Sequence, residues 1–186
     1  MLAQHDVWPD RIRPLRRVEY ESLVDRGLLD DSRVELLLGV LVDMTPQGPF
    51  HADVVAKLAA QLVRALPDSV EVRVQSPLAL SDDSEPEPDI AVVAAGDYRS
   101  AHPAQALLVV EVADTSLPKD RGVKTGLYAA AAVPEFWLVN LTDRLVEVHR
   151  RPAAGRYTEL HRVEAGGQLV PAGFPRVSVP VADLLE

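Results

Sequence analysis

The sequence predicts a mixed α/β fold in which helices pack on the faces of a β-sheet. Segments 89–94 and 107–112 are continuous apolar runs, the pattern of central strands that are buried on both faces. Segment 50–66 instead carries apolar residues at helical spacing, and Pro49 and Pro67 punctuate its ends. The order of the expected elements is helix, hairpin, helix, several strands, helix and further strands, which favours a mixed sheet flanked by helices.

The first half of the chain is expected to place an acid on a strand. Segment 15–27 is predicted to be a short helix, and segment 33–44 two short strands around a turn at Leu38-Gly39, so that Glu35 lies on a strand among apolar neighbours. A basic run precedes the helix and enters it. We interpret this run as a solvated arm or a dimer contact, and contact with phosphate is the alternative. The run consists of Arg11, Arg13, Arg16 and Arg17.

The second half is expected to complete the sheet. A strand at 70–75 is followed by a polar hairpin over 81–88, and an Ala-rich helix over 120–132 leads to a strand at 135–140. Additional antiparallel strands are predicted at the C-terminus, where a free sheet edge favours a homodimer. These strands are expected at 145–149, 157–163, 169–170 and 177–181. Residues 1–14 are predicted to form an N-terminal arm and residues 15–186 a single domain.

Composition excludes several classes of protein. The chain has 186 residues, of which 47% are hydrophobic, and its apolar runs are far shorter than the roughly 18–20 residues of a membrane span. It contains no cysteine, which excludes disulfides, thiolate metal sites and cysteine nucleophiles. Its beginning lacks the pattern of a signal peptide, so a cytoplasmic location is expected. A net charge of −9 argues against tight non-specific DNA binding, but a surplus of carboxylates suits a hard metal ion.

The usual catalytic motifs are absent from the sequence. It has no G-x-G-x-x-G, no G-x-x-x-x-G-K-[ST], no H-E-x-x-H and no G-x-S-x-G. Common nucleotide-phosphate loops, zincins and serine hydrolases are therefore excluded.

Two acids occupy strand positions where apolar residues are expected. Asp89 opens one of the buried runs and Glu111 closes the other. Because a buried ionised carboxylate is costly without a partner, each calls for a cation or several hydrogen-bond donors nearby. Mg²⁺ would satisfy both, with the backbone carbonyl of Val112 as a further ligand. The alternative is structural: Asp89 caps a turn and Glu111 forms a salt bridge at the strand end.

A lysine is the expected partner of such an acidic pair. Strand alternation places residue 113 on the face of Glu111, but this residue is Ala113. Lys124 lies in the next predicted helix with Tyr128 one turn further on, so both side chains share a face and the lysine can point back over the strand ends. The alternative is a surface pair between Lys124 and Asp120.

These residues resemble a known family. The order of the motifs is similar to that of the Uma-type family of putative restriction endonucleases, a branch of the PD-(D/E)XK nuclease superfamily, over roughly residues 15–150. Glu35-Leu-Leu-Leu-Gly39 and His51 also match. The motifs are Pro86-Glu-Pro-Asp-Ile90, Val109-Val-Glu-Val-Ala-Asp-Thr-Ser116, Lys119-Asp-Arg-Gly-Val-Lys124, Tyr128 and Val133-Pro-Glu-Phe-Trp-Leu-Val139.

The resemblance implies a restriction-endonuclease-like fold and DNA cleavage with Mg²⁺ or Mn²⁺. By this resemblance Asp89 and Glu111 hold the metal, Glu35 is an accessory acid, and Lys124 is the catalytic lysine displaced from strand to helix. It also implies that further residues line the cleft; for one of them, the histidine, a surface position at a helix start is the alternative. These residues are His51, Gln75, Asp120 and Tyr128.

The expected activity is Mg²⁺-dependent hydrolysis of phosphodiester bonds in DNA. The carboxylate-bound Mg²⁺ would activate water and bind a phosphoryl oxygen, and Lys124 would supply positive charge to the transition state or position the nucleophile. Two alternatives belong to other classes: a non-catalytic nuclease-fold protein that binds a partner, and a metal-dependent hydrolase of a small phosphate.

Overall fold

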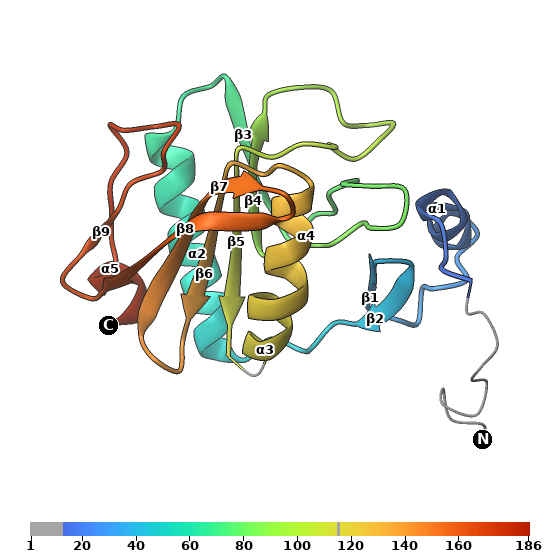
Figure 1. Ribbon diagram of the computed structural model, residues 1–186, viewed down its shortest axis with the longest axis horizontal. Coiled ribbons are helices and arrows are strands. Elements are labelled where there is room, and N and C mark those ends of the chain that lie inside the picture. The colour runs from blue at the N-terminus through green and yellow to red at the C-terminus, as the bar shows by residue number, and fades with distance from the viewer. Residues whose placement is uncertain (1–12, 115) are drawn as a thin grey trace.

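A six-stranded mixed sheet forms the centre of the protein (Figure 1). The structure, a computed structural model, describes residues 13–114 and 116–186. In the described residues the strand order is β3-β4-β5-β6-β7-β8, in which β5 and β6 run parallel and the other neighbours antiparallel. The strands are β3 (Val70–Val74), β4 (Ile90–Ala94), β5 (Leu108–Ala113), β6 (Glu135–Asn140), β7 (Leu145–Ala153) and β8 (Arg156–Glu164).

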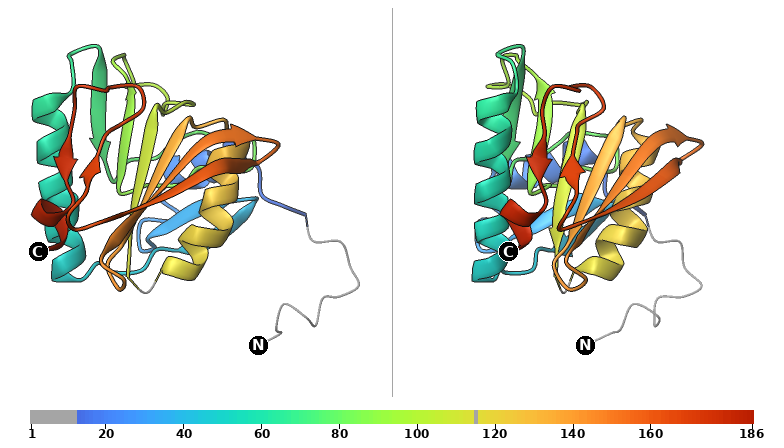
Figure 2. Two further views of the ribbon diagram at one scale, coloured as in Figure 1. Left: turned by 60° about the vertical axis from the view of Figure 1, so that its left-hand side comes forward. Right: turned by 90° about the vertical axis from the view of Figure 1, so that its left-hand side faces the viewer.

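Helices cover both faces of this sheet. Figure 2 shows α2 (Pro49–Ala65) on one face and α4 (Thr125–Ala130) on the other. The C-terminal elements pack on the α2 side, where their apolar residues join the larger core cluster. They are β9 (Gln168–Leu169), β10 (Val179–Pro180) and α5 (Ala182–Leu185).

The periodicity of the sequence explains the central elements. Every residue of β5 is buried, as expected for a strand covered on both faces. On α2, Val54, Leu58 and Leu62 recur every four residues and are fully buried against the sheet. Pro49 occupies the first turn of α2, where its missing amide hydrogen costs nothing. The predicted central strands and helix are confirmed.

A smaller unit lies beside the sheet (Figure 1), and Glu35 lies on one of its strands. It contains α1 (Arg17–Asp25) and an antiparallel hairpin of β1 (Val34–Leu37) and β2 (Val40–Asp43). Leu38 and Gly39 both have positive φ, at 52° and 77°. A two-residue turn with this backbone conformation matches the right-handed twist of the two strands that it joins. A Cβ at Gly39 would lie 2.3 Å from the Cβ of Pro14, so glycine is required there.

The helix predicted over 120–132 differs from the observed one. Helical structure begins earlier, with α3 (Leu117–Lys119), continues through a π-helical turn, η2 (Asp120–Lys124), and ends with α4. Pro118 is tolerated because it lies in the first turn. The π-helical turn was not predicted, because no periodicity in a single sequence distinguishes it from an α-helix.

Three other expectations need correction or lie outside the described residues. The polar hairpin over 81–88 is a tight turn closed by a single bridge between Ser81 and Ser84, since Pro86 and Pro88 supply no amide donors for a longer ladder. β10 is shorter than the strand expected at 177–181, β9 is shifted by one residue from the strand expected at 169–170, the two form a separate pair, and α5 was not predicted. Residues 1–12 of the predicted arm, with Arg11, lie outside the described part of the chain.

The basic run contacts the chain itself where it is described. Arg13 pairs with Glu19, Arg17 pairs with Glu21, and Arg17 Nε donates to the carbonyl of Ser81. Among the described helices, none is long and apolar enough to cross a membrane.

Candidate active site

Sheet register brings the two predicted metal ligands together. Ile90 of β4 pairs with Val110 of β5, so the preceding residue, Asp89, lies opposite Glu111. Opposed residues on antiparallel strands project from the same face of the sheet. Both side chains are nearly buried, and both line one pocket. The two acids thus converge at this pocket.

The lysine from the helix reaches the same place. Lys124 Nζ lies 2.9 Å from Glu111 Oε1 and 3.0 Å from Glu35 Oε2, and its side chain is only 4% exposed. Lys124 is therefore a buried bridge between two acids on different elements, and the alternative of a surface pair with Asp120 is wrong. Ala113 is buried in the core on the Glu111 side, as expected from the alternation.

Two further side chains fix the acids. His51, in the first turn of α2, places Nε2 3.1 Å from Asp89 Oδ2, which also accepts a hydrogen bond of 2.8 Å from the amide of Val112. Tyr128 donates to Glu111 Oε1 at 2.5 Å. The surface alternative for His51 is excluded, because its side chain is 13% exposed and contacts Asp89.

The pocket is small, open and acidic. Its volume is about 90 Å³. Six carboxylates and two lysines line it, so negative charge predominates even when both amines are protonated. Most of the predicted site residues lie here: Glu35, His51, Asp89, Glu111, Val112, Asp120 and Lys124.

Two residues predicted to line the cleft do not. Gln75 directly follows β3 with φ at 47°, and its backbone amide, not its side chain, contacts Asp89 by donating to the carbonyl oxygen. Tyr128 is fully buried behind Glu111 and supports that carboxylate from the core side. Neither is among the residues that line the pocket.

Lys119 is a site residue that the sequence analysis missed. Its Nζ lies 3.0 Å from Glu35 Oε1, so the two carboxylate oxygens of Glu35 contact different lysines. The prediction started the helix at Asp120 and so left Lys119 in a loop. No local pattern could have singled it out, because its partner Glu35 lies 84 positions away in the sequence.

Burial and crowding of acids determine the protonation of the site. Burial, with the neighbouring carboxylates of Asp89, Asp120 and Glu35, raises the pKa of Glu111 to about 8 despite the opposing effect of Lys124. Burial alone would lower the pKa of Lys124, but Glu111, Glu35 and Asp120 raise it above its ordinary value. Burial likewise raises the pKa of Asp120 and of Tyr128. Lys124 is therefore charged and Tyr128 is a hydrogen-bond donor.

The shift at Glu111 predicts a pH dependence of stability in the metal-free protein. The folded state binds the Glu111 proton more tightly than the unfolded state, whose pKa is near 4.5. The free energy of unfolding should therefore fall as pH rises from 4.5 to about 8, by a few kcal/mol in total. Denaturant titrations in EDTA across this range measure the slope.

A neutral variant isolates the contribution of this residue. Glu111→Gln should show a flatter profile than the wild type, whereas Glu164→Gln, which changes an exposed acid on β8, should leave the slope unchanged. Equal slopes in Glu111→Gln and the wild type would contradict the assigned shift.

The donor set of the pocket suits a hard divalent cation. The described residues contact Asp89 through Oδ2 and Glu111 through Oε1, which leaves Asp89 Oδ1 and Glu111 Oε2 without a partner among them. Within the described residues no group of three or more His, Asp or Glu side chains is placed to hold a metal. Two carboxylates, the Val112 carbonyl, water and substrate oxygens form the kind of set that Mg²⁺ accepts. Asp89, Glu111 and Val112 are the residues that could hold it.

The mixed sheet, with two acids and a lysine meeting at the ends of its central strands, defines a nuclease-like class of protein. The chain belongs to the Uma2 family, described as "Putative restriction endonuclease", whose model matches residues 18–182. The resemblance recognised in the sequence is thereby confirmed.

A solved structure supports the same fold. The chain is similar to a putative nuclease belonging to DUF820 from Anabaena variabilis, with a TM-score of 0.66 and 16% sequence identity over 82% of this chain and 89% of that chain. The restriction-endonuclease-like fold class predicted from the sequence is confirmed. Among proteins with curated descriptions, none matches this chain.

Proposed function

We propose that the protein is a Mg²⁺-dependent DNA endonuclease that hydrolyses phosphodiester bonds. The observation that carries the proposal is the convergence of Asp89, Glu111 and Lys124 at one open pocket, with Lys124 Nζ 2.9 Å from Glu111. Membership of a family of nuclease-like proteins supports it. The homodimer expected from the strands at the C-terminus stays a prediction.

The side chains of the pocket have two roles in this proposal: the acids bind the cation, and the lysine supplies positive charge to the substrate. Asp89 Oδ1 and Glu111 Oε2 are available to bind the cation, which, when bound, lowers the pKa of water and draws charge from a phosphoryl oxygen. Lys124 carries a positive charge toward the pocket and can stabilise the negative charge on the phosphoryl oxygens in the transition state. Glu35, whose oxygens contact Lys119 and Lys124, positions these amines and does not need to bind metal itself.

The shape of the pocket favours a polymer over a small phosphate. Sites that enclose a small ligand usually measure roughly 300–1,000 Å³, well above the 90 Å³ found here. A nucleic-acid strand, in contrast, needs only to lie across the opening of the pocket and place one of its phosphates there. The acidic lining would repel that phosphate unless a cation is bound, which makes metal a precondition for substrate binding.

Cleavage assays with metal removal test the proposal. Supercoiled plasmid and single-stranded DNA are incubated with the protein in Mg²⁺, in Mn²⁺ or in EDTA. Nicking should appear with either metal and disappear in EDTA.

The control is the double variant Asp89→Asn/Lys124→Met, purified in parallel. Nicking that persists in this variant would come from a contaminant and would overturn the assignment. Binding of metal and DNA without cleavage would favour the non-catalytic binding protein instead.

A further inference from the structure

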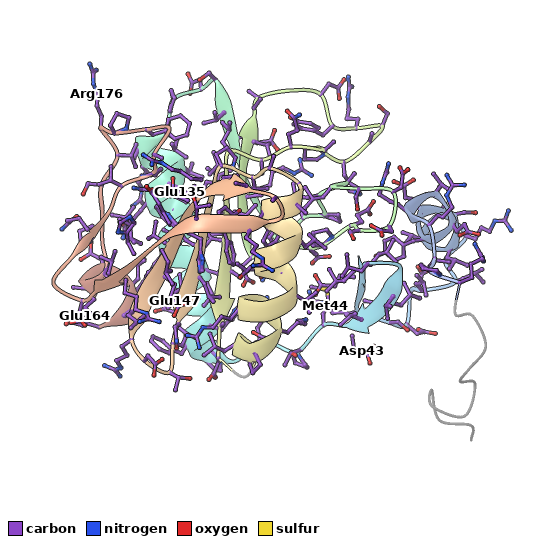
Figure 3. All side chains as sticks on the ribbon, viewed as in Figure 1. Asp43, Met44, Glu135, Glu147, Glu164 and Arg176 are labelled. Carbon is purple, nitrogen blue, oxygen red and sulfur yellow. The ribbon has the colours of Figure 1, made fainter. Side chains whose placement is uncertain are left out.

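A second buried acid lies at the level of the candidate site but outside its pocket. Glu111 on β5 pairs with Leu138 on β6, which in turn pairs with Glu147 on β7. The three side chains therefore form a row on one face of the sheet, with the two acids about 10 Å apart at the usual strand spacing. Glu147, labelled on the sheet in Figure 3, is 2% exposed.

Arg121 is the main partner of this second acid. Its Nη2 lies 2.8 Å from Glu147 Oε1 and its Nε lies 3.2 Å from Oε2, which is a bidentate pair. Such a planar fork constrains orientation as well as distance. Arg162 and His149 approach Glu147 less closely, at 3.6 and 3.8 Å.

Arg121 and Lys124 belong to the same π-helical turn. η2 covers Asp120–Lys124, and the amide of Thr125 donates to the carbonyl of Asp120, five residues earlier. The turn is therefore tied to the sheet at two points of one row, through Arg121 to Glu147 and through Lys124 to Glu111.

The direction of Lys124 depends on this turn keeping its extra residue. A π-helical turn inserts one residue into an α-helix, and such turns are frequent at functional sites. Conversion to plain α-helix would shift the register by one residue and rotate the side chains on one side of it by about 100°. Such a rotation would take Lys124 or Arg121 away from its carboxylate.

We propose that the Arg121–Glu147 pair is a positioning clamp that holds the π-helical turn in register and so directs Lys124 Nζ between Glu111 and Glu35. Neither residue of the clamp lines the pocket, so both act through Lys124. The effect on cleavage rests on the proposed function, whereas the effect on the placement of Lys124 does not.

Accessibility of Lys124 is the readout that is independent of activity. Wild type, Arg121→Ala and Arg162→Ala are treated with an amine-acylating reagent, and labelling of each lysine is followed by peptide mass spectrometry. In the wild type, Lys124 should be protected relative to Lys57, which is 44% exposed on α2. Arg121→Ala should label at Lys124 at a rate close to that of Lys57.

Arg162→Ala is the matched control. It removes another arginine from the same carboxylate, but Arg162 lies on β8 and has no part in the π-helical turn, so Lys124 should stay protected. Arg121→Lys should restore part of the protection because it keeps the charge but not the fork. Unchanged labelling in Arg121→Ala, or the same increase in Arg162→Ala, would overturn the clamp.

Kinetics give the second readout. Arg121→Ala should lower kcat by about 10–100-fold, the usual range for residues that orient a site residue, and should leave KM unchanged. Glu147→Gln should lower kcat less, because the amide keeps one hydrogen bond to Arg121. If the wild type cleaves no DNA, the proposed function fails while the labelling experiment still decides the clamp.

Discussion

Replacing Lys124 by methionine is expected to abolish cleavage and to lower the free energy of unfolding by about 3–5 kcal/mol, the usual cost of breaking a buried ion pair from one side. Methionine keeps the length of the side chain but leaves Glu111 and Glu35 buried without their shared cation. Lys119 contacts Glu35, so Glu111 is the more strongly affected acid. Denaturant unfolding followed by circular dichroism measures the stability, and plasmid nicking measures the activity.

A double variant separates the two effects. Glu111→Gln/Lys124→Met should recover part of the lost stability, because the glutamine is neutral whereas an unpaired Glu111 must either stay buried with its charge or take up a proton, and should recover no activity. Lys57→Met is the control: this lysine is exposed and pairs with Asp53 on α2, so the change should cost less than about 1 kcal/mol. Full activity in Lys124→Met would refute the catalytic role of the lysine.

Asp89→Asn is expected to reduce cleavage by about 1,000-fold, which equals about 4 kcal/mol of transition-state stabilisation. The amide oxygen can still accept from the amide of Val112, so the fold should be retained, whereas the charge that attracts the cation is lost. Isothermal titration with Mg²⁺ or Mn²⁺ should show weaker binding in the same variant.

The matched control for this second change is Asp97→Asn. Asp97 is an exposed acid paired with Arg99, and its loss should change neither metal binding nor cleavage. Metal affinity in Asp89→Asn equal to that of the wild type would remove Asp89 from the metal site.

The local pattern of the sequence was sufficient for most of the fold. Apolar runs identified β4 and β5, and four-residue spacing identified α2, because burial on two faces or on one stripe leaves a direct trace in residue order. The turn at Leu38-Gly39 could be predicted for the same reason, since its geometry depends on two adjacent residues.

Contacts between distant segments explain what the sequence analysis missed. Lys119 reaches Glu35 across 84 positions of sequence, and Arg121 reaches Glu147 across 26, so no local pattern marks either pair. The resemblance implies that Gln75 lines the cleft. Whether its side chain or its backbone amide approaches Asp89 depends on the backbone conformation directly after β3.

By itself, the sequence determined the helices and central strands, and the two acids and the lysine that stand out from them. The tertiary structure alone decided that strand register brings Asp89 opposite Glu111, that a π-helical turn directs Lys124 toward them, and that Glu147 lies in the same row. The physical reason is that the periodicity of burial depends on residues that are close in sequence. Strand register and the direction of side chains depend instead on ion pairs between elements that meet only after folding.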